Sequence, residues 1–158
     1  MGVDHLGHFA LTCLLGDKIT DRVVAVASAM YLFARIHIDD LNWHTRRYSA
    51  MSAYAESKLA NLLFVHELTA RGIRADASDP GMTDTGITRS AADRSGRQGA
   101  RASIEAVSTD LPSGTYLAPR FNQWGRPKVT KLGPKGRDPL MARRLWEASA
   151  DLTGCNWP

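Results

Sequence analysis

The sequence predicts an open α/β fold, in which a parallel β-sheet of about three strands carries helices on its faces. A short apolar run at 23–27 is followed by a long helical pattern at 52–72 and by a second short strand-like run at 73–78. This order of strand, helix and strand indicates a parallel βαβ unit with a right-handed crossover. The 158 residues, 44% of them hydrophobic, suit one domain with its own core, and residues 1–158 are expected to form a single domain.

Periodicity and chain-breaking residues predict the individual elements. The strand at 23–27 is apolar at every position, which is typical of burial on both faces of a parallel sheet. In the long helix Ser52 is the expected N-cap and Gly72 is placed to end it. In the final helix Leu140 and Leu145 are expected to face inward. The other expected elements are a helix at 3–15, a helix at 100–109, a short strand at 115–118, an extended loop at 121–139 and the final helix at 139–152.

Composition narrows the classes of function. The net charge is +4, and the basic residues between 89 and 147 are scattered among Gly and Pro, so no nucleic-acid partner is expected. No apolar run approaches the roughly 18 residues of a membrane span, and no signal-peptide pattern begins the chain, so a soluble, cytoplasmic protein is expected. Cys13 and Cys155 lack metal-binding or redox spacing, and no metal site is expected.

The long helix carries a candidate proton-transfer pair. Tyr54 and Lys58 stand four residues apart, so their side chains lie on one face, one turn from each other. A phenol with a pKa of about 10 is a poor acid or base at neutral pH. A neighbouring ammonium favours the phenolate and is expected to lower that pKa. Spacing alone leaves open a solvated tyrosine packed over a lysine stem.

Three segments are predicted to meet at one rim of the sheet. The strand at 23–27 ends at Ser28, and the strand at 73–78 is stopped by Asp79, Pro80 and Gly81. In open parallel sheets, ligands bind beyond the carboxyl ends of the strands, and the first turns of the long helix approach that edge. The long loop at 31–51 is rich in apolar and aromatic residues. It suits a wall for an apolar substrate, although simple packing over the sheet end explains it as well.

The motif AYAESKLANLLF, with the spacing of Ser28, Tyr54 and Lys58, resembles the short-chain dehydrogenase/reductase family, specifically its retinol-dehydrogenase-like branch. The resemblance runs from VDHLGHFALT to RRLWEASADLTG, nearly the whole chain. It implies the C-terminal part of a Rossmann-like, doubly wound parallel sheet. The implied reaction is hydride transfer between NAD or NADP and a small hydrophobic alcohol or carbonyl substrate.

The resemblance also implies a role for each matching residue. Tyr54 would act as the general acid/base, Lys58 would bind the nicotinamide ribose, and Ser28 would hydrogen-bond the reacting oxygen. A family segment P-G-x-x-x-T lines the nicotinamide, although Thr85 in that segment is as well explained as a helix cap. The cofactor-binding residues implied in this way are Tyr54, Lys58, Pro80, Gly81, Thr83 and Thr85.

Two departures from the family pattern carry expectations of their own. Asp4 stands where the family has a catalytic Asn in V-N-H-L-G-H-F. Its carboxylate can only accept hydrogen bonds, and its charge opposes ionisation of Tyr54, so Asp4 is expected to weaken turnover. The sequence also contains no glycine-rich G-x-x-x-G-x-G fingerprint, so it looks like a truncated chain with little activity of its own.

These departures leave a second function open. Without the strand that would pair beside it, the apolar strand at 23–27 becomes an open sheet edge. Helix pairs of this family commonly form dimers through the helices retained here, so self-association as a homo-oligomer is expected. The alternative to an oxidoreductase is therefore a non-catalytic remnant or a dimerising interaction module.

Overall fold

The computed structural model describes residues 1–83, 96–121 and 123–157, and its centre is a four-stranded sheet. The first three strands are parallel, and the fourth runs antiparallel to the third. The predicted open α/β fold, part of a Rossmann-like parallel sheet, is therefore confirmed. In their order across the sheet the strands are β1 (Val23–Val26), β2 (Ala75–Ser78), β3 (Tyr116–Pro119) and β4 (Pro127–Val129).

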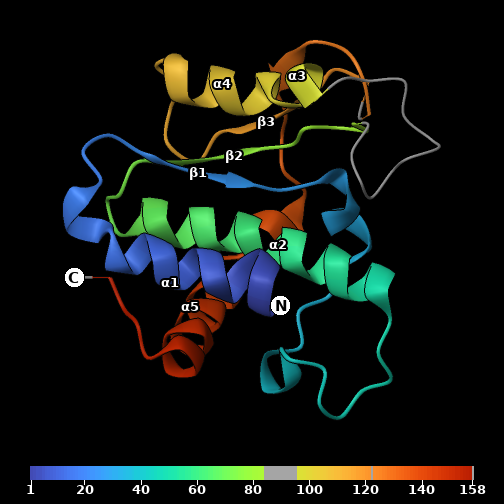
Figure 1. Ribbon diagram of the computed structural model, residues 1–158, viewed down its shortest axis with the longest axis vertical. Helices are drawn as coiled ribbons and strands as arrows, with labels where there is room; N and C mark the ends of the chain where they lie inside the picture. Colours follow the sequence, from blue (N-terminus) through green and yellow to red (C-terminus); the bar gives the residue numbers. More distant parts are fainter. Residues whose placement is uncertain (84–95, 122, 158) are drawn as a thin grey trace.

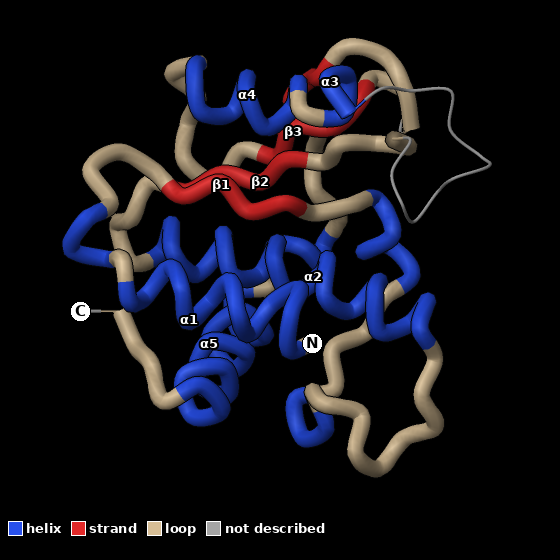
Figure 2. The backbone as a smooth tube through the Cα atoms, in the orientation of Figure 1, coloured by secondary structure: helices blue, strands red, loops and turns tan. Residues whose placement is uncertain are grey.

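Helices cover both faces of this sheet, as Figure 1 shows. One face carries α1, α2 and α5, and the other carries the short α3 and α4. Their bounds are α1 (Gly7–Leu14), α2 (Ala50–Ala70), α3 (Gly96–Gly99), α4 (Arg101–Ser108) and α5 (Pro139–Thr153). Short helical turns complete the chain (Figure 2): η1 (Gly2–Leu6), η2 (Gly16–Lys18), η3 (Ala29–Phe33), η4 (Ile38–Asp40) and η5 (Pro134–Arg137).

The N-cap of the central helix α2 lies three residues before the predicted one. Ser49 is the N-cap and its side chain accepts a hydrogen bond from the amide of Ser52, so the prediction of Ser52 as the cap is wrong. The predicted end is confirmed. Gly72 has a φ of +80°, which glycine adopts without steric cost, and the amide of Ile73 donates to the carbonyl of Leu68, closing the last turn.

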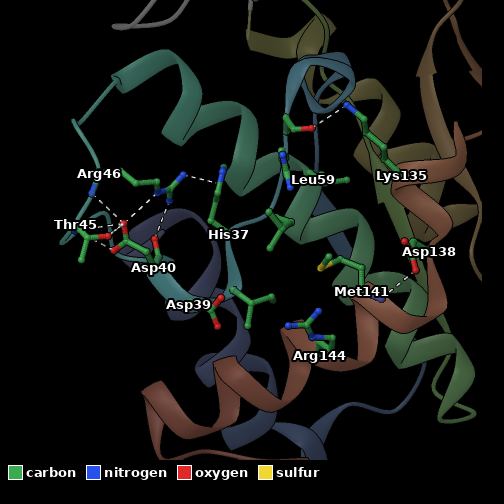
Figure 3. A pocket seen from close by; sticks show the side chains of 14 residues that line it. His37, Asp39, Asp40, Thr45, Arg46, Leu59, Lys135, Asp138, Met141 and Arg144 are labelled. Atoms are coloured by element: carbon green, nitrogen blue, oxygen red, sulfur yellow. Dashed lines mark hydrogen bonds and ion pairs between the residues drawn. The ribbon is translucent and has the colours of Figure 1, made fainter.

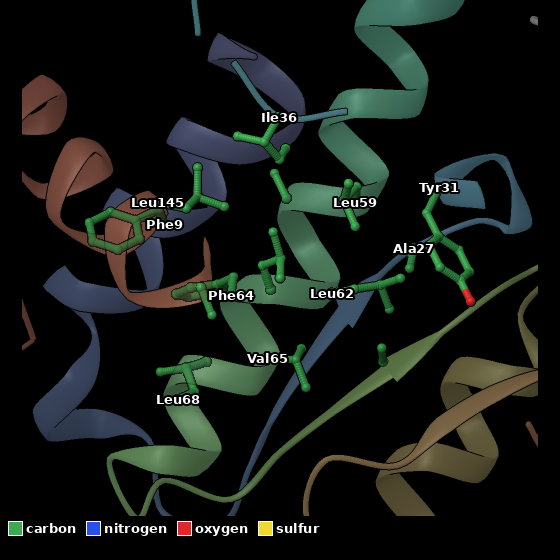
Figure 4. Packing of buried hydrophobic residues seen from close by; sticks show 14 of the residues in the cluster. Phe9, Ala27, Tyr31, Ile36, Leu59, Leu62, Phe64, Val65, Leu68 and Leu145 are labelled. Atoms are coloured by element: carbon green, nitrogen blue, oxygen red, sulfur yellow. The ribbon is translucent and has the colours of Figure 1, made fainter. Parts of the chain in front are cut away.

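The core lies between α2 and its neighbours on that face of the sheet (Figure 4). Leu62 and Leu63 of α2 are fully buried. Three aromatic rings join α1, α2 and α5, with centroids 5.0 Å apart for Phe9 and Trp146 and 5.6 Å apart for Phe9 and Phe64. Burial of these side chains supplies the apolar driving force that fixes α2 over the sheet.

Several predicted details differ in the structure. β1 is an edge strand, and Val26 is 40% exposed, so burial on both faces is incomplete. The expected loop at 121–139 contains β4, which pairs with β3. In α5, Leu145 is buried as predicted, whereas Leu140 is 68% exposed, so its predicted inward orientation is wrong. In the described part of the chain, no helix has both the length and the apolar character needed to traverse a bilayer.

Candidate active site

Ser28, Tyr54 and Lys58 come together at the rim where β1 ends. Tyr54 lies in the second turn of α2 and is 38% exposed, and the Nζ atom of Lys58 lies 5.3 Å from the centroid of its ring. Ser28 follows β1 and caps η3, and its hydroxyl acts on Tyr54 in the direction that lowers the pKa of the phenol. The geometry therefore unites the three residues in one constellation, with the phenol open to solvent and the ammonium largely buried.

The electrostatics of Tyr54 differ from the expectation drawn from helical spacing. Burial raises the pKa of Tyr54, hydrogen bonding with Ser28 lowers it, and the charges of Asp79 and Asp4 raise it, so that the pKa lies above its ordinary value. The expected lowering is therefore wrong for this chain. Burial lowers the pKa of Lys58, and the same two carboxylates act in the opposite direction. Two anions beside one cation favour the neutral phenol.

Asp4 lies in a π-helical turn that starts the first helix. This turn, η1, replaces the beginning of the regular helix predicted at 3–15. The backbone carbonyl of Asp4 accepts a hydrogen bond of 3.1 Å from Nδ2 of Asn61, a buried side chain of α2. Asn61 also donates to the carbonyl of Val26, at 3.0 Å, and so ties the turn to the edge strand. Asp4 is thus held where its charge acts on Tyr54.

The segment after β2 supplies the remaining predicted residues. Pro80, Gly81 and Thr83 follow β2 at the same rim, and Thr85 lies outside the described residues. Gly81 has a φ of +67°, and a Cβ atom there would lie 2.6 Å from the carbonyl oxygen of Gln123. Only glycine fits this close approach, so the sharp turn after β2 depends on it.

Asp79 is the rim residue that sequence reasoning missed. The sequence predicts for Asp79 only a role in stopping the strand, yet it is 2% exposed and accepts hydrogen bonds from three donors. A usable signal was present, since an aspartate that directly follows a buried strand needs hydrogen-bond partners if it is buried too.

The hydrogen-bond donors of the Lys58 ammonium fit the hydroxyl oxygens of a nicotinamide ribose, the group that Lys58 would bind according to the family resemblance. The residue is 8% exposed, and within the described residues no oxygen is hydrogen-bonded to its Nζ atom. An ammonium that is mostly buried and has no hydrogen-bond acceptor among the described residues suits ligand hydroxyl oxygens. Among residues 1–83, 96–121 and 123–157, no group of three or more His, Cys, Asp or Glu side chains is arranged to hold a metal ion.

A cavity of about 630 Å³ lies beside the long loop rather than at the rim (Figure 3). Its walls come from the loop after η3, from α2 and from α5, and they combine apolar side chains such as Ile36, Leu59 and Met141 with charged ones such as Arg144. None of the three rim residues lines it. The loop is thus a wall of a separate cavity, and its interpretation as the wall of the substrate site at the rim is not supported.

A charged network fixes this loop against α2. The carboxylate of Asp40 accepts hydrogen bonds from the backbone and side chains of Thr45 and Arg46. Burial acts to raise the pKa of Asp40, but these hydrogen bonds outweigh it and hold the pKa well below its usual range. Arg46 also pairs with the buried Glu56 at 3.1 Å, and Nδ1 of His37 lies 2.6 Å from the same carboxylate. The network explains how a long loop keeps a defined shape.

The chain resembles known proteins over nearly all of its length. Human retinol dehydrogenase 13 is 33% identical over 183 residues, and mouse retinol dehydrogenase 12 is 36% identical over 179 residues. Each match covers 99% of this chain and 54% of the relative, so the chain spans about half the length of the curated relatives it matches. No protein-family model matches the chain.

A solved structure matches the fold. The crystal structure of an uncharacterised protein from Mycobacterium paratuberculosis superposes with a TM-score of 0.86 at 43% identity, covering 99% of this chain and 59% of that one. This match and the sheet define a Rossmann-like α/β fold. Over 97% or more of its length the chain is similar to retinol dehydrogenases, which are members of the short-chain dehydrogenase/reductase family.

Proposed function

We propose that this chain carries the proton-transfer and nicotinamide end of an NAD(P)-dependent short-chain dehydrogenase/reductase, with a hydrophobic alcohol or carbonyl compound as substrate. The observation that carries the proposal is the meeting of Ser28, Tyr54 and Lys58 at one rim, with the phenol exposed and the ammonium buried. The names of the relatives specify retinol, itself a hydrophobic alcohol.

The proposed mechanism moves one proton at Tyr54. In the reducing direction, the hydroxyls of Ser28 and Tyr54 donate hydrogen bonds to the substrate carbonyl oxygen, and Tyr54 releases its proton as that oxygen gains negative charge. The ammonium of Lys58 stabilises the phenolate that remains. NAD(P), when bound, supplies the hydride, and Lys58 with the turn at 80–83 would hold its nicotinamide end.

Fluorescence titration with NADH and NADPH tests the cofactor half of the proposal. We expect weak but saturable binding by the wild type, a loss of at least about tenfold in Lys58→Met, and no change in Lys128→Met. Lys128 is a matched control because it lies exposed on β4. Absence of binding by the wild type, or equal binding by both variants, would count against the proposal.

Turnover of retinal or decanal with either cofactor tests the catalytic half. Removing the phenolic hydroxyl in Tyr54→Phe deletes the only proton donor of the mechanism, so the rate should fall at least about 100-fold. Tyr48→Phe is the matched control, because Tyr48 is 66% exposed and lies just before α2. A Tyr54→Phe variant with the wild-type rate would refute the assignment.

Asp4→Asn tests the predicted effect of the carboxylate near the phenol. The charge of Asp4 raises the pKa of Tyr54, so its removal is expected to increase turnover severalfold in protein that binds cofactor. Asp17→Asn, on an exposed aspartate of η2, should leave the rate unchanged. An unchanged or lower rate in Asp4→Asn would contradict the prediction.

A second candidate is a non-catalytic, self-associating module. It is favoured by the apolar face of the first helix, where Val3 is 84%, Leu11 57% and Leu14 69% exposed. Buried against a second copy, such a face would contribute to a homo-oligomer. Sedimentation analysis distinguishes the cases: a dimer dissociated by Leu11→Ser and Leu14→Ser, with no effect of Tyr54→Phe on any cellular activity, would favour this module.

A further inference from the structure

A second cavity, of about 410 Å³, lies toward the end of the sheet opposite the rim. Its walls come from the second half of α2, from the residues just before β3, from the end of β4 and from η5. Because β3 runs parallel to β1 and β2, its start lies at the edge of the sheet away from Ser28 and Pro80. Tyr54 and Lys58 belong to the first half of α2 and do not line this cavity. Its volume falls within the roughly 300–1,000 Å³ that is typical of small-molecule sites.

The second cavity is apolar at its base. Leu62 and Val65 of α2 are 1% and 3% exposed, and they line it together with the half-buried Leu132. A Cβ atom at Gly136 would lie 3.3 Å from Cδ1 of Leu62 and 3.4 Å from Cδ2 of Leu132, so η5 packs closely against α2 at this base. A base of this kind suits the alkyl part of a ligand.

Three basic side chains line the same cavity, whereas none of the described residues that line it is Asp or Glu. They are His66 of α2, Lys131 after β4 and Arg137 of η5. Within the described part of the chain, none of the three side chains forms a hydrogen bond or an ion pair. Their N–H groups can therefore donate to a bound anion, and the imidazole can do so whether it is neutral or protonated.

The acidic residues next to them in the sequence, Glu67 and Asp138, are engaged elsewhere. Glu67 forms an ion pair with Arg71 at 2.9 Å. The carboxylate of Asp138 caps α5 and accepts a hydrogen bond of 3.0 Å from the amide of Met141. Neither carboxylate pairs with the three basic side chains, so charge complementarity favours an anionic ligand in the second cavity.

Exposure orders these groups from the base of the cavity to its mouth. Leu62 and Val65 are buried, His66 is half-buried, and Lys131 and Arg137 are exposed. An anion that entered with its charge first would bring that charge against the apolar base, where burial without hydrogen bonds is costly. Entry by an apolar end leaves the anionic group at the mouth, beside the two exposed cations.

We propose that the second cavity binds a small organic anion that carries an alkyl chain, such as a medium-chain carboxylate, with the chain against the apolar base and the anionic group held by Lys131 and Arg137. Binding here involves neither the cofactor nor the three residues of the rim, so the inference is independent of the proposed function. Two charge-assisted hydrogen bonds and a short buried chain correspond to a dissociation constant of about 1 mM or lower.

Isothermal titration calorimetry of the wild type with octanoate and with octyl phosphate tests the proposal. Octanol carries the chain without the charge, and acetate carries the charge without the chain. We expect saturable binding of at least one octyl anion, and binding at least about tenfold weaker for octanol and acetate. Equal binding of octanol would show an apolar groove only and would overturn the proposal. So would the absence of saturable binding of either octyl anion up to about 10 mM.

Charge-removing variants test which side chains hold the anionic group. Lys131→Gln and Arg137→Gln change exposed side chains outside the core, and each should weaken binding of the tighter octyl anion at least about fivefold. Lys128→Gln and Arg143→Gln are the matched controls, because they remove the same charges from exposed residues that do not line the cavity, and both should bind like the wild type. An equal loss in the controls would show a general effect of net charge and would contradict the proposal.

Nuclear Overhauser effects between the octyl chain and protein methyl groups locate the ligand. We expect them at Leu62 and Val65 of the second cavity and not at Ile36 and Leu59, which line the cavity beside the long loop. Contacts at Ile36 and Leu59 alone would place the ligand in that other cavity and would refute the proposal. Failure of these measurements leaves the proposed function untouched, since that function is tested by cofactor binding and turnover at the rim.

Discussion

Lowering the pH from about 7 to about 4 is expected to destabilise the fold through one buried histidine. His5 of η1 is 1% exposed and bridges two helices. Its Nδ1 atom lies 3.2 Å from Oδ1 of Asn61 in α2, and its Nε2 atom lies 3.0 Å from Oγ of Ser149 in α5. Because Nδ2 of Asn61 already donates to two backbone carbonyls, Oδ1 must accept, and Nδ1 of His5 carries the proton.

The magnitude follows from the shift of the pKa of His5. Burial lowers the pKa from 6.5 to about 4, outweighing the hydrogen bond with Asn61. Between these values the unfolded chain binds a proton that the folded chain does not, so the free energy of unfolding falls as the pH falls below 6.5 and levels off below about 4. The difference between the two pKa values corresponds to about 3 kcal/mol of stability.

Urea unfolding followed by tryptophan fluorescence at several pH values measures this loss. The variant His5→Gln cannot titrate, so its stability should depend on pH less steeply than that of the wild type, by about 3 kcal/mol over the whole window. His8→Gln, on an exposed histidine of α1, should keep the wild-type slope. Equal slopes in the wild type and His5→Gln would refute the reasoning. An NMR titration of His5 with a midpoint above 6 would do so even if the variant failed to fold.

Three further predictions concern the elements that frame the rim. Leu63→Ala should cost about 3 kcal/mol of stability because the side chain is fully buried, whereas Leu140→Ala, at a site that is 68% exposed, should cost little; chemical denaturation compares them. Because only Ser49 caps α2, Ser49→Ala should lower the free energy of unfolding by about 1 kcal/mol and Ser52→Ala by much less. Thermal unfolding of the two variants measures this difference. Gly81→Ala should destabilise by about 2 kcal/mol or more because of its positive φ and the contact at 2.6 Å; wild-type stability in that variant would contradict this backbone conformation.

The framework of the fold was predictable because its signals are local. An apolar run, a helical period of 3.6 and a chain stop recur in the order that a parallel βαβ unit requires. Gly72 ends α2 as predicted, since the left-handed conformation after a helix is itself a local property. Tyr54 and Lys58 share a face for the same reason, because their separation along a helix fixes their geometry.

The structure differs from the sequence prediction where contacts between residues far apart in the chain determine the local conformation. Ser49 and Ser52 both have a side chain that can cap a helix. Which of them caps α2 depends on the residue at which the preceding loop ends and the helix begins. That loop is held by the ion pairs of Arg46 with Asp40 and Glu56. The hydrophobic periodicity of the sequence does not predict these ion pairs. The strand β4 lies in a segment rich in Gly and Pro, and it exists because β3 offers it an edge to pair with.

The direction of the pKa of Tyr54 shows most clearly what a motif leaves undetermined. The Tyr-x-x-x-Lys spacing fixes one cation near the phenol, and on that basis the pKa should fall. The structure adds burial and the carboxylates of Asp79 and Asp4, which lie 25 residues after and 50 residues before Tyr54 in the chain and raise its pKa instead. The helix therefore sets which atoms can exchange a proton, whereas the segments that pack around it set the pH at which they do so. A substitution outside the motif, such as Asp4→Asn, should then change the pKa of Tyr54 although the Tyr-x-x-x-Lys spacing stays intact.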